Sequence, residues 1–220
     1  MLVLGLDTST PAVSVALVDT GLGVLGERVV VDGRRHGEVL AVGIRGVLTA
    51  AGCAPRELGA VVVGLGPGPF TGLRVGIVTA ASFGDALGIA VHGVCSLDGL
   101  ALPGRPTLAV TDARRSEVYW AAYDGAGARV QGPHVDAPAV ARTAAAGRSV
   151  VGDGAHRYAF VGVLDVPRWP SVPALIARAP LATEPGPLVP LYLRRPDAQE
   201  PAVPAPARRH ARTSTEPMPG

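Results

Sequence analysis

The sequence contains no lysine and no asparagine, and only 4% of its residues are aromatic. All 20 basic residues are therefore arginines, a bias that we attribute to GC-rich coding, so a single arginine carries less functional weight than usual. The net charge of +2 favours neither nucleic acid nor a membrane surface as a partner. With 48% hydrophobic and 17% charged residues, the chain is too apolar to be wholly disordered and can form one compact unit or two small lobes.

The residue types that usually carry catalysis or bind metals are also few. Cys53 and Cys95 have apolar neighbours and no C-x-x-C spacing, so we expect buried free thiols in a reducing cytosol rather than a disulfide. The 5 histidines form no H-x-x-x-H or H-E-x-x-H pair, and their spacing predicts no metal site. Neither a G-x-S-x-G elbow nor a cysteine nucleophile signature is present, so the sequence predicts no catalytic residue.

Long hydrophobic runs are missing too. No apolar stretch of about 20 residues is free of charges, glycine or proline, which argues against a membrane-spanning helix. The N-terminal apolar run lacks a basic region and is broken at Asp7, which indicates a buried strand rather than a secretory signal. We therefore expect a cytoplasmic protein with no membrane partner.

Residues 1–104 predict a first α/β lobe. Three strand-like segments with short turns between them imply an antiparallel meander, and alternating helices and strands then complete a mixed sheet. The expected strands are 2–6, 13–18, 24–31, 60–65 and 89–94, and the expected helices are 37–51 and 71–87.

Residues 105–195 predict a smaller and less regular second lobe, after a proline-containing boundary at 103–106. The expected strands are 107–111, 118–123 and 149–151, with helices near 137–146 and 172–179. Residues 196–220 are rich in proline, alanine and arginine without apolar periodicity, so we expect a disordered tail.

Each predicted lobe has an acidic turn between two strands. In the first, Asp7 is followed by Thr8, Ser9 and Thr10, a combination that can hold a phosphate and orient the water shell of a metal. Taken alone, an ordinary hairpin is the better interpretation, because these side chains bond their own backbone. Asp112 stands at a similar turn in the second lobe. Actin-like ATPases clasp nucleotide phosphates between two such turns, although coincidence remains an alternative.

The segment from Gly66 to Gly76 joins a buried strand to a helix through a rigid glycine-proline turn, with Thr71 as the expected N-cap. Small residues follow at intervals of four: Gly72, Gly76, Ala80, Gly84 and Gly88. Glycine inside a helix costs about 1 kcal/mol relative to alanine, so the stripe needs a compensating close contact. That contact is either a helix of another subunit or packing within the lobe, and the sequence does not decide between them.

Arginine pairs at 34–35, 114–115, 194–195 and 208–209 are candidates for contacts with RNA phosphates. Solvated surface charge is the better interpretation, because no aromatic residues are interleaved with them in the sequence.

Several motifs together resemble one known family, TsaB/YeaZ, over residues 1–198. The most specific is GLGPGPFTGLRVG at 64–76. The supporting segments are 4–10 (LGLDTST), 14–17 (SVAL), 35–38 (RHGE), 112–115 (DARR), 117–119 (EVY), 152–154 (GDG), 191–194 (LYLR) and 196–198 (PDA).

This resemblance implies a two-lobed actin/sugar-kinase/Hsp70-like fold with ribonuclease H-like mixed sheets and a reduced second lobe. It also implies a non-catalytic scaffold for forming N6-threonylcarbamoyladenosine (t6A) in tRNA, paired with the catalytic subunit TsaD and assisted by the ATPase TsaE. TsaD carries an H-x-x-x-H metal pair that this chain lacks. The tRNA would be reached only through the complex, and a homodimer of the chain alone stays an open alternative.

The resemblance also assigns site residues. The family contacts TsaD through the two first-lobe helices, here about 37–51 and 71–88. This resemblance favours a contact of the stripe with another subunit over packing within the lobe. The expected contact residues are Leu40, Ile44, Val47, Gly72, Gly76, Ala80, Gly84 and Gly88. No cofactor is expected to be required. Any ATP or ADP with magnesium would bind weakly or vestigially, through Asp7, Thr8, Ser9, Thr10 and Asp112.

Two other functions remain as alternatives. An autonomous actin-like ATPase or small-molecule kinase would need a general base and a complete adenosine pocket, which the sequence does not display. A direct tRNA-binding module would use the arginine pairs. Family members were once labelled glycoprotease-like, but no protease machinery is visible in the sequence.

Overall fold

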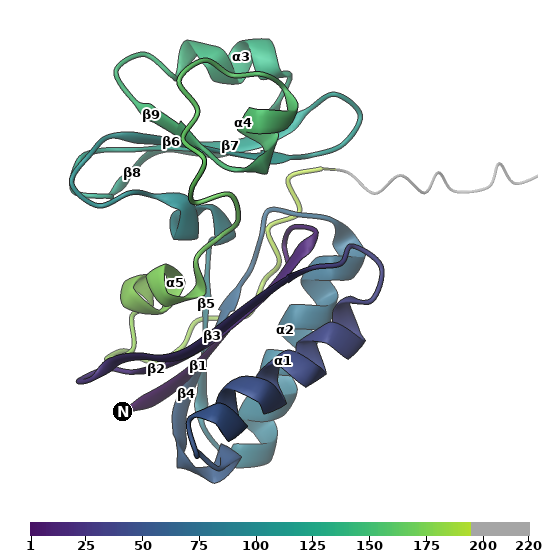
Figure 1. Ribbon diagram of the computed structural model, residues 1–220, viewed down its shortest axis with the longest axis vertical. Coiled ribbons are helices and arrows are strands. Elements are labelled where there is room, and N and C mark those ends of the chain that lie inside the picture. The colour runs from purple at the N-terminus through teal and green to yellow at the C-terminus, as the bar shows by residue number, and fades with distance from the viewer. Residues whose placement is uncertain (195–220) are drawn as a thin grey trace, which may run out of the picture.

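A computed structural model describes residues 1–194 as two lobes, each built on one β-sheet (Figure 1). The predicted disordered tail, 196–220, lies outside the described residues. None of the helices within residues 1–194 is long and apolar enough to cross a bilayer.

The first lobe contains a five-stranded mixed sheet in the order β3-β2-β1-β4-β5. The strands β1 (Leu2–Asp7), β2 (Ala12–Asp19) and β3 (Gly23–Val31) form the predicted antiparallel meander. The strands β4 (Leu58–Gly64) and β5 (Ala90–Val94) run parallel to β1. Parallel neighbours need a crossover, and helices supply it here.

Two long helices cover one face of this sheet and a short helix covers the other (Figure 1). α1 (His36–Ala50) and α2 (Phe70–Leu87) pack on side chains such as Leu4, Leu6 and Val63. α5 (Val172–Arg178) packs on the opposite face, against Val3 and Ala60 among others. Coverage on both faces explains why β1 and β4 are continuously apolar rather than alternating. A 3-10 turn, η1 (Pro55–Glu57), precedes β4.

The predicted N-cap of α2 is wrong. The helix begins at Phe70 with Pro69 in the N-cap position, and no side chain caps it. Proline suits this place because its φ is fixed and its missing N–H is not needed there. Thr71 therefore lies inside the first turn.

The second lobe contains a four-stranded sheet in the order β8-β7-β6-β9. The strands β6 (Thr107–Asp112), β7 (Val118–Tyr123) and β9 (Ser149–Val151) match the predicted segments. The strand β8 (Arg129–Asp136) and the short helix α4 (Asp153–Arg157) were not predicted. The predicted helix near 137–146 is shorter, as α3 (Pro138–Thr143).

The two sheets repeat the same four-strand plan. In each, three antiparallel strands form a meander, and a fourth strand then pairs in parallel with the first. The first strand of each meander has six residues and ends in an aspartate, Asp7 in β1 and Asp112 in β6. The two acidic turns therefore occupy equivalent places in the two lobes.

The chain returns to the first lobe after the second sheet, which corrects the predicted division at residue 104. Gly5 leaves the space that Val172 and Ile176 of α5 fill. Further on, the Leu191 amide donates to the Leu65 carbonyl at 2.8 Å. The 3-10 helix η2 (Ser96–Leu100) lies between the lobes, since Asp98 accepts a hydrogen bond from the Tyr123 hydroxyl at 2.8 Å. Of the predicted second lobe, residues 105–194, which the structure describes, are thus shared between the two lobes.

Both cysteines are free, and Cys95 is buried as expected, whereas Cys53 is only half-buried. Burial raises the pKa of the Cys95 thiol to about 12, so this thiol is protonated and unreactive at neutral pH.

Candidate functional site

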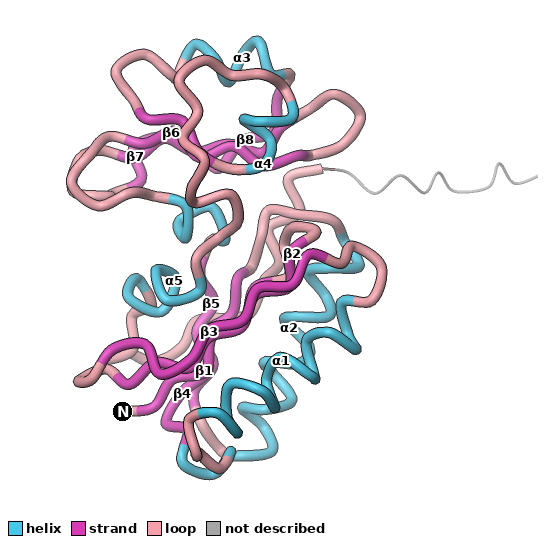
Figure 2. Tube along the Cα trace, in the orientation of Figure 1, coloured by secondary structure: helices cyan, strands magenta, loops and turns pink. Residues whose placement is uncertain are grey.

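A cavity of about 390 Å³ lies where the first acidic turn meets the second lobe. Pro11 comes from the β1–β2 turn, Asp112 ends β6, and α4 contributes one face. The loop of residues 158–171, which Figure 2 shows running from α4 to α5, closes another side. The lining residues are Pro11, Asp112, Asp153, His156, Arg157, Arg168 and Trp169.

Asp112 is held in place by three neighbours. Its Oδ1 accepts hydrogen bonds from the Tyr158 hydroxyl at 2.8 Å and from the Arg114 amide at 3.0 Å. Its Oδ2 lies 3.6 Å from Nη1 of Arg157, whose side chain is 64% exposed. An ion pair this exposed contributes little stability, so Arg157 can exchange the carboxylate for another anion.

Asp153 is the most perturbed group that lines the cavity. Only 8% of the residue is exposed, and its Oδ1 has no hydrogen-bond partner. Burial, followed by the nearby charge of Asp112, raises the pKa of Asp153 to about 6. His156 Nε2 is buried and unpartnered as well. Buried polar atoms of this kind are rare in folded proteins and mark places where a ligand or water completes the bonding.

Asp7 does not reach this cavity. It is 1% exposed, and its Oδ1 accepts from the Ser9 amide at 3.0 Å and the Ser9 hydroxyl at 2.7 Å. Burial is the main reason that the pKa of Asp7 is raised. Its Oδ2 has no partner and lies where a side chain on Gly64 would otherwise be.

The hydroxyls that follow Asp7 are also used internally. The Thr8 hydroxyl donates to the Gly72 carbonyl at 2.8 Å, and Thr10 Oγ1 accepts from the Ala12 amide at 3.2 Å. His36 Nε2 lies 3.1 Å from the Thr10 carbonyl oxygen. Of the five residues predicted to touch a nucleotide, the structure places Asp112 on the cavity and buries the other four. The turn instead fixes the start of α2.

The predicted use of the small-residue stripe is also corrected. A Cβ on Gly72 or Gly76 would overlap Thr8, and one on Gly84 would overlap Val91 of β5. Ala80 is fully buried, and Gly88 is the left-handed C-cap of α2. The stripe therefore accommodates the chain's own turn and strand, not the backbone of another subunit.

The predicted contact residues on α1 are core residues too. Leu40, Ile44 and Val47 are 1%, 3% and 4% exposed and pack in the first-lobe core. The outer faces of the helices carry other apolar residues. Val42 on α1 is 44% exposed and Val78 on α2 is 61% exposed. A contact between these helices and a partner stays a prediction, and it would use the outer faces.

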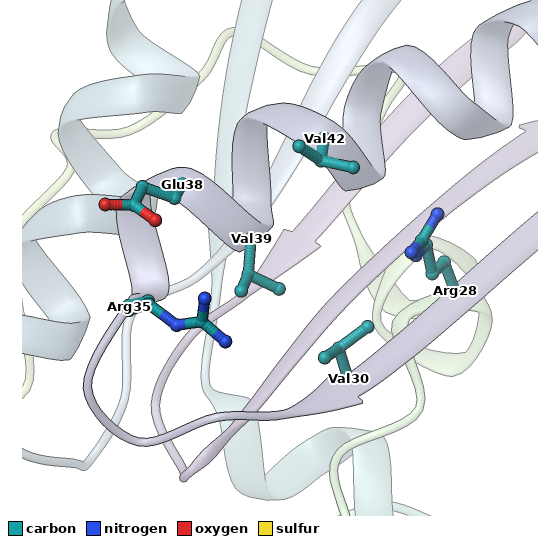
Figure 3. A pocket seen from close by; sticks show the side chains of 6 residues that line it. All are labelled: Arg28, Val30, Arg35, Glu38, Val39 and Val42. Carbon is teal, nitrogen blue, oxygen red and sulfur yellow. The ribbon is translucent and has the colours of Figure 1, made fainter.

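A second, smaller hollow of about 180 Å³ lies between β3 and α1 (Figure 3). It is lined by three valines, Val30, Val39 and Val42, and by the charged side chains of Arg28, Arg35 and Glu38. Arg35 is already paired with Asp32 at 2.8 Å. None of the buried, unpartnered polar atoms found in the described part of the chain belongs to a residue lining this hollow, so the cavity between the lobes is the better candidate site.

The sequence did not indicate most of the lining residues. Asp153 was noted only as part of a family motif, and Trp169 and Arg168 carried no signal. They meet because the loop before α5 folds back over α4 (Figure 2). Within residues 1–194, no three His, Cys, Asp or Glu side chains are grouped so as to hold a metal ion.

Comparison with known proteins identifies the family to which this chain belongs. A family model described as TsaD, tRNA N6-adenosine threonylcarbamoyltransferase, matches residues 20–161. A crystal structure from Pseudomonas aeruginosa, of an uncharacterized protein similar to the peptidase YeaZ, superposes with a TM-score of 0.72 at 30% identity. It covers 88% of this chain and 99% of that one. The chain belongs to the TsaB/YeaZ family. The two-lobed α/β fold with two mixed sheets that was expected from the sequence is confirmed, and it is the fold of the YeaZ structures.

Proteins with sequences similar to this TsaB/YeaZ protein extend the comparison beyond solved structures. An uncharacterized protein of Mycobacterium tuberculosis strain H37Rv is 50% identical over 205 residues, covering 91% of this chain and 95% of its own length. The tRNA threonylcarbamoyladenosine biosynthesis protein TsaB of Bacillus subtilis is 33% identical over 129 residues. That match covers 56% of this chain and 55% of the relative, so the likeness to TsaB itself is partial.

Proposed function

We propose that the chain is a non-catalytic subunit of the bacterial machinery that forms t6A in tRNA, and that it acts by binding TsaD. Membership of the TsaB/YeaZ family carries this proposal, together with relatives in Bacillus subtilis and Escherichia coli that are named for t6A biosynthesis. TsaE is the third expected component, and tRNA is the substrate of the whole assembly.

The state of the first acidic turn supports a role other than phosphotransfer. Actin-like phosphotransfer needs phosphate-binding groups that face the cleft. Here Asp7 and Ser9 bond each other, and Thr8 bonds α2. ATP or ADP with magnesium would therefore meet Asp112 without its counterpart and would bind weakly. The competing function, an autonomous ATPase or kinase, predicts tight ATP binding with turnover by the isolated chain, which calorimetry measures.

The outer faces of α1 and α2 support a partner contact. Both helices lie on the same side of the sheet (Figure 1), and each exposes a valine that the core does not use. Exposed apolar residues on paired helices are the usual seam of a helical bundle. The same faces would serve a homodimer when TsaD is absent.

Charge substitutions on these faces test the proposal. Val42→Asp and Val78→Asp would each place a charge in the seam, and we expect at least tenfold weaker association with TsaD and a matching loss of t6A formation. Val161→Asp is the control, since Val161 is 91% exposed and lies after α4, away from both helices. Complex mass after mixing purified proteins is the measurement, and circular dichroism verifies folding. Wild-type association by folded Val42→Asp and Val78→Asp variants would refute the proposed contact.

A further inference from the structure

The strand β3 forms one edge of the first sheet, and its outer side is open. β2 lies beside it on one side, and no strand among residues 1–194 pairs with the other. Edge strands are usually protected by proline, charge or a covering segment, because their free N–H and C=O groups can pair with another chain. The last three residues of β3 are all valines, and Val29 and Val31 are 44% and 59% exposed.

The backbone groups of Val29 and Val31 face the open side. The Asp32 amide, directly after β3, donates to the Pro11 carbonyl, directly before β2, at 3.0 Å. Opposed residues in an antiparallel pair alternate between bonding each other and pointing away. Because Asp32 bonds across to the neighbouring strand, Val31 and Val29 point their N–H and C=O groups away from β2. These groups are available to an added strand.

The sequence at this edge is complementary to itself when two copies run antiparallel. It reads Arg-Val-Val-Val-Asp over residues 28–32. A two-fold axis midway between two Val30 residues places Arg28 opposite Asp32 of the second copy, and Val29 opposite its Val31. Positions 28 and 32 share one face of the sheet, since side chains alternate along a strand. Opposite charges and paired β-branched side chains are both favourable across a strand pair.

The neighbouring registers are less favourable. With the axis at Arg28, this arginine faces its own copy, and with the axis at Val31, Arg28 faces Arg34. Like charges directly opposite each other destabilise a strand pair. An axis at Val29 sets Arg28 against a valine and gains no charge pair. The charges therefore favour the register centred on Val30.

The hollow between β3 and α1 also suits a second copy. Val30 and Arg28 project from β3 on the side where Val39 and Val42 of α1 line the hollow (Figure 3). In the register described, the two Val30 side chains occupy a non-hydrogen-bonded position, where opposed residues approach most closely. The two hollows would then adjoin across the axis and be closed by each other's valines.

The charges beside the edge are available for this contact. Arg28 is exposed and has no ion-pair partner within residues 1–194. Asp32 is paired with Arg35 at 2.8 Å, but the Arg35 side chain is 66% exposed. An ion pair this exposed contributes little stability, so Arg35 can share Asp32 with an arginine of a second copy. Glu38, on the same hollow, offsets the added positive charge.

We propose that the chain forms a two-fold symmetric dimer by antiparallel pairing of β3 with β3 of a second copy, in the register that sets Arg28 against Asp32. The first-lobe sheets of the two copies would become one continuous sheet. Each β3 edge is used once, so the pairing closes at a dimer. It uses the sheet edge rather than the outer faces of α1 and α2, so it goes beyond the proposed function and is compatible with bound TsaD.

Sedimentation equilibrium of the isolated full chain measures this association. We expect a micromolar Kd, because the paired segment is short and the interface is small. Val31→Pro removes an N–H that faces the open side and no bond to β2, and proline is tolerated at such an edge position. We expect at least tenfold weaker self-association. Val31→Thr is the matched control, since it keeps the N–H and the β-branched shape and should associate like the wild type.

Arg28→Glu tests the register, because it sets a second acid opposite Asp32 at both ends of the paired segment. We expect at least tenfold weaker self-association at low salt. Arg56→Glu is the control for the change of charge, since Arg56 is exposed on η1, outside β3. It should associate like the wild type. Circular dichroism verifies that each variant is folded.

A wild-type chain that stays monomeric up to about 100 µM overturns the inference. A folded Val31→Pro or Arg28→Glu variant that associates as strongly as the wild type overturns it too. Loss of the dimer in Val78→Asp but not in Val31→Pro would assign self-association to the helix faces and refute pairing through β3. The measurement needs no TsaD, so its result is independent of the proposed function.

Discussion

Replacing Asp153 by asparagine should stabilise the protein at neutral pH, and the effect should vanish in mild acid. The pKa of this carboxyl is about 6 in the folded protein against an ordinary value of 3.8. A group whose folded pKa is raised binds more protons when folded, so the stability of the wild type falls as pH rises through this window. This difference of about two pKa units lowers the stability of the folded wild type by about 3 kcal/mol at pH 7. Asparagine carries no charge and escapes this penalty.

Asparagine also preserves an oxygen atom that interacts with the backbone amides beside Asp153. The backbone amides of Asp112 and Gly154 lower the pKa of Asp153 and partly offset the effect of its burial. Asparagine keeps an acceptor oxygen beside these amides, so the substitution removes the charge and leaves an acceptor in place.

Urea unfolding followed by tryptophan fluorescence measures this effect. Trp120 lies in β7 and Trp169 lines the cavity, so both report on the region around Asp153. We expect the free energy of unfolding of Asp153→Asn to exceed that of the wild type by about 3 kcal/mol at pH 7 and to match it near pH 4. Asp165→Asn, at an exposed position, is the control. A stabilisation that does not change with pH, or a loss of stability at pH 7, would refute the assignment of a buried charge.

The remaining predictions concern the contact between the first acidic turn and α2. Gly76→Ala should cost about 2 kcal/mol by overpacking, because its Cβ would overlap Thr8 Oγ1. Gly46→Ala in α1 should instead stabilise by up to about 1 kcal/mol, since only the flexible end of Arg28 lies nearby. Thr8→Val should cost about 1 kcal/mol, because it deletes the buried hydrogen bond to the Gly72 carbonyl. Exposed Thr49→Val is its control. Urea midpoints measure all four variants, and a Gly76→Ala protein as stable as Gly46→Ala would contradict the packing described here.

The sheets could be predicted from the sequence because their apolar runs are bounded by clear turn residues. β8 was missed because Gly132-Pro133 interrupts it and only two of its eight residues are large and apolar. α4 was missed because it is one turn long and begins beside two glycines. Such elements are determined by tertiary packing more than by local preference.

The small-residue stripe shows where spacing alone stops being informative. Four-residue intervals predicted a close approach to the helix, and that approach exists. Spacing does not identify the approaching group, which here is Thr8 of the first turn and Val91 of β5. The cavity was harder still to predict, because Asp112, Asp153 and Trp169 meet only after the loop before α5 has folded back.

The two lobes share one order of strands, but their equivalent acidic turns have different roles. In the first, burial of Asp7 and the bond from Thr8 to Gly72 join the acidic turn to α2 and so fix the helix pair whose outer face we propose for TsaD. In the second, the equivalent Asp112 stays at a cavity with unpartnered atoms on α4. Sites that share no side chain usually respond to mutation independently. A variant that loses TsaD through Val42 should therefore keep the cavity, and one that loses the cavity through Trp169 should keep TsaD.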